Sequence, residues 1–132
     1  MTLGISIFTT PIPKGRPRFY GNHAVTPPKT REYEKLIREE WTHGMMNGPL
    51  HVTTVFTFKV PKSYSKKKHA ELIGMPKTTK PDLDNLVKAV LDALNGVAYE
   101  DDSNICGTVA IKKYGEEDEV FIMIEEVEEK NG

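Results

Sequence analysis

The stretch KPDLDNLVKAVLDALNGVAYEDDSNI, residues 80–105, decides the fold, because it combines a clear amphipathic helix with acidic residues at both ends. Apolar residues recur at the spacing of one buried helical face: Leu83, Leu86, Val87, Val90, Leu91 and Leu94. Polar residues lie about one turn apart on the opposite face: Asp84, Lys88, Asp92 and Asn95. Because Gly96 is a suitable residue to end a helix, the pattern predicts a helix that begins at Leu83 and ends before Gly96.

Four further segments have the pattern of β-strands. Apolar residues alternate over residues 3–8, and Val, Thr and Phe dominate residues 51–60. Residues 105–114 and 120–127 have the same character. The short turn between these last two segments predicts that they form a hairpin.

A second helix is predicted from Thr30, as its N-cap, to about His43. The chain has 132 residues and no internal repeat or linker, so we expect a single domain over residues 1–132. The predicted fold class is α/β in the broad sense (α+β), with a mixed four-stranded sheet and two main helices in the order strand, helix, strand, helix, strand, strand. The order of the strands within the sheet cannot be read from this pattern.

The composition is that of an ordinary soluble globular protein, with 38% hydrophobic and 28% charged residues. No apolar run approaches the roughly 20 residues that a membrane span requires. Residues 1–15 lack a basic start and a long apolar core, so we expect no signal peptide and a cytoplasmic location. The single cysteine, Cys106, cannot form an intrachain disulfide, and we expect it to be a small buried strand residue.

Charge is divided along the chain, although the net charge is only −1. Residues 1–80 hold 14 Lys and Arg against 5 acidic residues, whereas residues 116–132 hold 1 Lys against 8 acidic residues. A positively charged region of this kind attracts polyanions, which suggests a nucleic-acid partner.

Two segments carry most of the positive charge. Residues 13–30 are rich in Pro and Gly and predict a loop without regular structure, and residues 61–80 predict a mobile lysine-rich arm. Solvated loops are the alternative interpretation of both, but the single sign of the charge favours contacts with a phosphate backbone. The candidate DNA-binding residues are Lys14, Arg16, Arg18, Lys66, Lys67, Lys68 and Lys80.

Several carboxylates in one place are costly unless a cation neutralises them. Mg²⁺ prefers oxygen ligands and is usually held by one or two carboxylates together with substrate phosphate and water, so the Asp-only character of the stretch fits this ion. Each residue also has an ordinary explanation: Asp82 or Asp84 could cap the helix, Lys88 could form surface pairs, and Asp101 and Asp102 could form a turn. Spacing alone leaves the structural and the catalytic interpretations open.

The same residues carry a resemblance to a known family. Lys80, Asp82, Asp84, Asn85, Leu86, Lys88 and Ala89, then Asp92, Ala93 and Leu94, then Asp101 and Asp102, match the pattern of a basic residue, D-x-D-N-L-x-K-A, D-A-L and a late D-D pair. The stretch resembles the RusA family of Holliday junction resolvases. This resemblance implies that Asp82, Asp84 and Asp102 hold Mg²⁺, with Mn²⁺ as an alternative, and that Lys88 supplies an essential charge. It also implies a homodimer, and the choice of Asp102 over Asp101 rests on it.

The resulting hypothesis is a Mg²⁺-dependent, structure-selective endodeoxyribonuclease that resolves Holliday junctions by paired symmetric nicks, in DNA recombination and repair. Its catalytic residues are expected to be Asp82, Asp84, Lys88 and Asp102, and its partner is branched DNA. Two alternatives stay open: a non-catalytic module that binds branched DNA, and a nuclease of the same chemistry that acts on other branched DNA.

Overall fold

The structure is a computed structural model that describes residues 1–15, 18–21, 23–25 and 27–128. Its elements are, in chain order, β1 (Thr2–Ile7), β2 (Arg18–Tyr20), β3 (His23–Val25), α1 (Pro28–Glu40), β4 (Leu50–Lys59), α2 (Lys66–Leu72), α3 (Leu83–Leu94), the short 3-10 helix η1 (Asp102–Asn104), β5 (Ile105–Gly115) and β6 (Glu119–Glu126). The fold is α+β with a mixed four-stranded sheet, which confirms the predicted class.

The main sheet has the strand order β1-β6-β4-β5. The pair β4–β5 is parallel, and the pairs β1–β6 and β4–β6 are antiparallel. The predicted hairpin between residues 105–114 and 120–127 is therefore wrong, because β4 lies between these two strands. The connection from β5 to β6 crosses the end of β4 instead: Val60 N–H donates to the Gly115 carbonyl (3.2 Å), and Lys59 N–H donates to Asp118 Oδ1 (2.8 Å).

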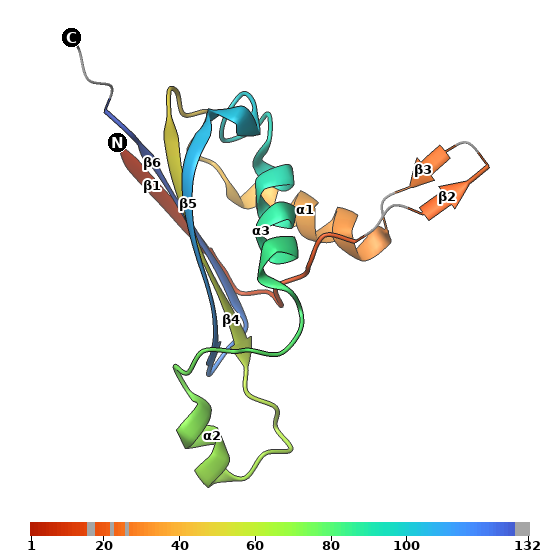
Figure 1. Cartoon of the computed structure of the whole chain (residues 1–132), viewed down its shortest axis with the longest axis vertical. Coiled ribbons are helices and arrows are strands. Elements are labelled where there is room, and N and C mark those ends of the chain that lie inside the picture. Colours follow the sequence, from red (N-terminus) through yellow and green to blue (C-terminus); the bar gives the residue numbers. More distant parts are fainter. Residues whose placement is uncertain (16–17, 22, 26, 129–132) are drawn as a thin grey trace.

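Both main helices cover the same face of the sheet, as Figure 1 shows. Helix α3 is the crossover that two parallel strands require, here β4 and β5. Its buried residues are Leu86, Ala89, Val90, Ala93 and Leu94, which join a core that includes Val52, Phe56, Ile122 and Ile124 from the strands. The helix begins and ends as predicted, and Gly96 follows it with a φ of +80°. The stretch that decides the fold thus spans the middle of the helical layer.

Helix α1 begins earlier than predicted. Thr30 is not its N-cap but lies inside the helix with 2% of its surface exposed, and its hydroxyl accepts a hydrogen bond from Gly15 N–H (3.3 Å). The helix begins at Pro28 after Pro27, because a proline in the first turn has no N–H that needs a partner. Tyr33 and Ile37 pack into the core as expected.

The opposite face of the sheet carries no helix in the described part of the chain (Figure 1). Val109 and Ile111 of the edge strand β5 point outward on it, with 57% and 47% of their surfaces exposed. Cys106, near the start of the same strand, is also exposed. The prediction that Cys106 is buried is therefore wrong, because it lies on an edge strand that α3 covers only in part.

The Pro- and Gly-rich segment does contain regular structure, contrary to the prediction. Strands β2 and β3 pair in antiparallel fashion, with Tyr20 opposite His23 and with Gly21 in the turn at a φ of +62°. The dipeptide Gly21-Asn22 is a known signal of a two-residue hairpin turn, and it could have indicated this element. Figure 1 shows the hairpin projecting from the body of the molecule.

The lysine-rich arm also contains a regular element. Helix α2 begins after Ser65, whose hydroxyl accepts a hydrogen bond from Lys68 N–H (3.2 Å). It lies beyond the end of β4, at the opposite end of the molecule from η1 (Figure 1). Among the residues that the structure describes, no helix is long and apolar enough to cross a membrane.

Candidate active site

The polar face of α3 carries Asp84 and Lys88, both exposed, as the sequence predicts. The apolar face of the helix is buried, so the backbone that presents these side chains is held rigidly. The spacing of four residues between Asp84 and Lys88 would allow a surface ion pair between them. In the described part of the chain, however, neither residue forms a salt bridge within 4 Å.

Asp82 and Asp84 lie together at the start of α3. Asp82 occupies the N-cap position, but its side chain makes no capping hydrogen bond. Asp84 lies in the first turn, and its Oδ1 accepts a hydrogen bond from the adjacent Asn85 N–H (2.9 Å). Both side chains are exposed. The partial positive charge of a helix N-terminus favours carboxylates here. Asp84 accepts from one first-turn N–H, whereas the Asp82 side chain makes no capping bond.

Asp101 and Asp102 lie at the other end of α3. Asp101 caps η1, since its Oδ2 accepts from Ser103 N–H (3.0 Å) and its own N–H donates to Asn104 Oδ1 (3.3 Å). Hydrogen bonding to Ser103 lowers the pKa of Asp101 below its ordinary value. Among the described residues, no hydrogen bond involves the carboxylate of Asp102. The structural interpretation of Asp101 is therefore confirmed, whereas the Asp102 side chain is free for another role.

The two groups of acids do not meet within one chain. The twelve residues of α3, at about 1.5 Å of rise per residue, separate Asp82 from the end of the helix by roughly 18 Å. Figure 1 shows η1 beyond that end of α3 and the start of α3 at the opposite end. Across residues 1–15, 18–21, 23–25 and 27–128, no group of three or more His, Cys, Asp or Glu side chains is arranged to hold a metal ion.

Asp92, on the third turn of α3, is occupied by an ion pair. Lys14 Nζ donates to Glu34 Oε1 (2.5 Å) and lies 3.2 Å from Asp92 Oδ2, while Lys14 N–H donates to the Asn85 carbonyl (2.9 Å). Burial lowers the pKa of the Lys14 ammonium, but its bonds to Glu34 and Asp92 outweigh this and raise it. Lys14 thus ties the N-terminal loop to α1 and α3.

The Tyr99 hydroxyl lies in the negative field of the carboxylates near the end of α3. This hydroxyl donates to the Leu91 carbonyl (2.6 Å). Burial, and then the negative charges of Asp102, Asp92 and Asp101, raise the pKa of Tyr99 far above its ordinary value. Asp92 and the late Asp pair therefore act on the same tyrosine hydroxyl.

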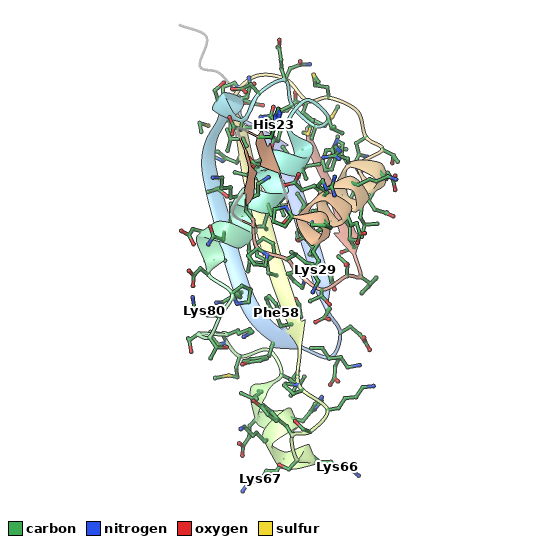
Figure 2. The ribbon with its side chains drawn as sticks, turned by 90° about the vertical axis from the view of Figure 1, so that its right-hand side faces the viewer. His23, Lys29, Phe58, Lys66, Lys67 and Lys80 are labelled. Carbon is green, nitrogen blue, oxygen red and sulfur yellow. The ribbon has the colours of Figure 1, made fainter. Side chains whose placement is uncertain are left out.

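The remaining basic candidates are distributed over three places. Lys66, Lys67 and Lys68 are exposed on α2, and Figure 2 shows Lys66 and Lys67 pointing away from the body of the molecule. Lys80 is exposed beside the start of α3. Arg18 begins β2, and Arg16 lies outside the described residues.

Comparison with known proteins is consistent with the sequence motif. The family model described as endodeoxyribonuclease RusA matches residues 9–125. The chain is also 34% identical to the uncharacterized protein YqaN of Bacillus subtilis (strain 168), over 136 aligned positions that cover 92% of this chain and 94% of the relative. Both matches include the whole of α3 and the acids at its two ends.

Proposed function

Because this chain belongs to the RusA family of endodeoxyribonucleases, we propose that it is a divalent-metal-dependent nuclease that resolves four-way DNA junctions by paired symmetric nicks. At the level of the family, the activity is that of a Holliday junction endonuclease. Such an enzyme acts on recombination and repair intermediates, and we expect it to work in the cytoplasm.

One observation carries the proposal. Asp84 and Lys88 share one face near the start of a well-packed helix, Asp82 precedes it at the N-cap position, and the side chains of Asp82 and Lys88 perform no structural duty that would otherwise explain them. Asp82 makes no side-chain capping bond, and within the described residues Lys88 makes no ion pair with Asp84. Exposed charges without a structural partner, on a well-packed element, are typical of a functional site.

Asp82 and Asp84 fit a hard divalent ion, since Mg²⁺ usually binds one or two carboxylates and completes its shell with water and substrate phosphate. A bound ion supplies Lewis-acid activation of the scissile phosphate. Lys88, one turn beyond Asp84, is suited to orient that phosphate and to offset the negative charge that develops on its oxygens. Mn²⁺ has the same ligand preference and is an alternative ion.

The role of Asp102 as a third ligand is implied by the family resemblance alone. Within one subunit this residue lies beyond the far end of α3, roughly 18 Å along the helix axis from Asp82. We therefore assign the ion to Asp82 and Asp84, and a contribution of Asp102 to the same ion requires a second subunit.

We propose that DNA phosphates bind on both sides of this site. Lys66, Lys67 and Lys68 on α2, together with Lys80, form the contacts on one side, and Arg18 of the β2–β3 hairpin forms one on the other. Arg16 stays a candidate from the sequence and lies outside the described residues. Lys14 was a candidate for the same role. Its ammonium is held by Glu34 and Asp92, so we assign it the role of anchoring the segment that leads to the β2–β3 hairpin.

The protein is proposed to act as a homodimer, because a dyad lets two sites cut a twofold-symmetric junction symmetrically. The open face of the sheet is the surface that we assign to this contact. Val109 and Ile111 are large apolar residues with about half of their surfaces exposed there, on the face opposite to α3. This arrangement leaves both α3 helices free to meet DNA.

The test is an incubation of the purified protein with end-labelled four-way, three-way and linear duplex DNA, in Mg²⁺ or in EDTA. The proposal expects paired nicks in the four-way junction only, and only with Mg²⁺. Equal cleavage of the three-way substrate would favour a nuclease of other branched DNA. Binding without cleavage in Mg²⁺ and in Mn²⁺ would show a non-catalytic module and would overturn the proposal.

A further inference from the structure

The segment that leads into α3 runs along the free edge of β5. Gly74 N–H donates to the Tyr114 carbonyl (2.9 Å), Tyr114 N–H donates to the Met75 carbonyl (3.0 Å), and Lys77 N–H donates to the Lys112 carbonyl (3.0 Å). This ladder ends at Lys77. The main chain between Lys77 and α3 must therefore be held by other groups.

The side chains of Lys77 and Lys112 bind this part of the main chain. Lys112 Nζ donates to the Thr79 carbonyl (2.6 Å) and to the Pro81 carbonyl (2.7 Å). Lys77 Nζ donates to the Lys80 carbonyl (2.8 Å) and to the Thr79 hydroxyl. Three consecutive carbonyl groups immediately before Asp82 thus accept hydrogen bonds from two ammonium groups.

Neither ammonium group is fully solvated or paired with a carboxylate, as those of surface lysines usually are. Both residues are partly buried, and in the described ranges neither has a carboxylate within 4 Å. Lys77 Nζ also lies 5.3 Å from the centre of the Phe58 ring and 5.4 Å from that of Tyr114, within cation–π range. Figure 2 shows Phe58 and Lys80 at about the same height in the molecule, between α2 and the body of α3.

We propose that Lys77 and Lys112 are positioning residues that fix the backbone of Asp82 and so prepare the metal site. The proposal rests on the proposed function. The Pro81 carbonyl held by Lys112 belongs to the peptide group that supplies Asp82 N–H, and the Asp82 carbonyl accepts from Leu86 N–H (3.2 Å) in the first turn of α3. The peptide groups on both sides of Asp82 are therefore fixed, whereas its carboxylate stays free of hydrogen bonds in the described structure.

Groups that hold a metal ligand in place commonly change metal affinity by about 10- to 100-fold when they are removed. Lys112→Met removes the ammonium group and keeps most of the apolar stem. Lys113→Met is the matched control, because neighbouring strand residues point to opposite faces of the sheet and no hydrogen bond of the Lys113 side chain occurs in the described residues.

The test measures Mn²⁺ binding to DNA-free protein by the loss of the free-Mn²⁺ electron paramagnetic resonance signal. We expect Lys112→Met to weaken the Mn²⁺ Kd by at least about 10-fold, with the circular dichroism spectrum and junction binding in EDTA unchanged. Lys113→Met should match the wild type. Cleavage by Lys112→Met should recover at high Mn²⁺, as a purely structural defect would not.

A Kd for folded Lys112→Met within twofold of the wild type would overturn the inference and leave the proposed function intact, provided that the wild type cleaves junctions. Absence of both Mn²⁺ binding and cleavage in the wild type would overturn both. If Lys112→Met does not fold, Lys77→Met, which leaves both Lys112 bonds in place, must show the loss of affinity.

Discussion

Replacing Lys67 by Ala tests whether α2 grips the phosphate backbone. Lys67 is exposed, and Figure 2 shows its side chain pointing away from the body of the molecule. Alanine preserves helix propensity, and the cap from Ser65 to Lys68 N–H is untouched. Because each phosphate contact contributes about 0.9 to the slope of log K against log salt concentration, the substitution should lower this slope by about 0.9.

That change in slope means that the affinity of the wild type for the junction falls more steeply with salt than the affinity of Lys67→Ala does. Between 50 and 200 mM salt, the wild type should lose about 3.5-fold more affinity than Lys67→Ala does. The assay is fluorescence anisotropy of a labelled four-way junction, titrated in EDTA over a series of KCl concentrations. Lys35→Ala is the control, because Lys35 is also exposed on a helix but pairs with Glu39 at 3.7 Å. A slope that is the same for Lys67→Ala and the wild type would refute the assignment of α2 to DNA binding.

Three further predictions concern the metal, the core and the dimer. Asp84→Asn should weaken Mn²⁺ binding by on the order of 10-fold or more, because it removes a ligand. Asp102→Asn should change the Mn²⁺ affinity by less than about threefold, because Asp102 lies outside the ligand set of one subunit. A loss for Asp102→Asn as large as that for Asp84→Asn would show that Asp102 reaches the ion from a second subunit. Lys14→Met should lower the free energy of unfolding by about 2 kcal/mol, because it leaves Glu34 without its close partner. Since the pKa of Lys14 is raised in the folded protein, this difference should persist at neutral pH and fade only above its ordinary value of 10.5; an equal urea midpoint for both proteins would argue against the pair. Ile111→Glu should reduce the mass in light scattering from that of two chains to 14.9 kDa, and a mass that stays at two chains would exclude the open sheet face as the contact.

Local patterns in the sequence predict the elements of this fold well. The apolar period of α3 appears directly in its buried residues, such as Leu86, Val90 and Leu94, and Gly96 ends the helix as expected. The four main strands lie close to their predicted ranges. In each case, the signal comes from residues within a few positions of one another.

Pairing between distant segments could not be predicted in the same way. The segments 105–114 and 120–127 have equal strand character and a short turn between them, so nothing local indicates that β4 lies between the two. Likewise, the lysine at position 112 has no local signal for its contacts, because it bonds carbonyls 31 and 33 residues earlier in the chain.

The candidate site shows the same division. The shared face of Asp84 and Lys88 follows from their spacing of four residues, and the place of Asp82 just before the helix could also be predicted from the sequence. The placement of Asp102 depends on the path of the chain after α3, and within one subunit that path keeps it at the far end of the helix.

The most direct test of the central claim compares cleavage and binding of a four-way junction by Asp82→Asn. Loss of a metal-binding carboxylate removes several kcal/mol of transition-state stabilisation, so cleavage in Mg²⁺ should fall by at least about 100-fold. Binding in EDTA should stay equal or become tighter, because a negative charge near the phosphate is removed. Glu100→Gln, which removes an exposed acid beyond the other end of α3, should cleave like the wild type. Cleavage by Asp82→Asn within a few fold of the wild type, or a loss of junction binding, would contradict the account.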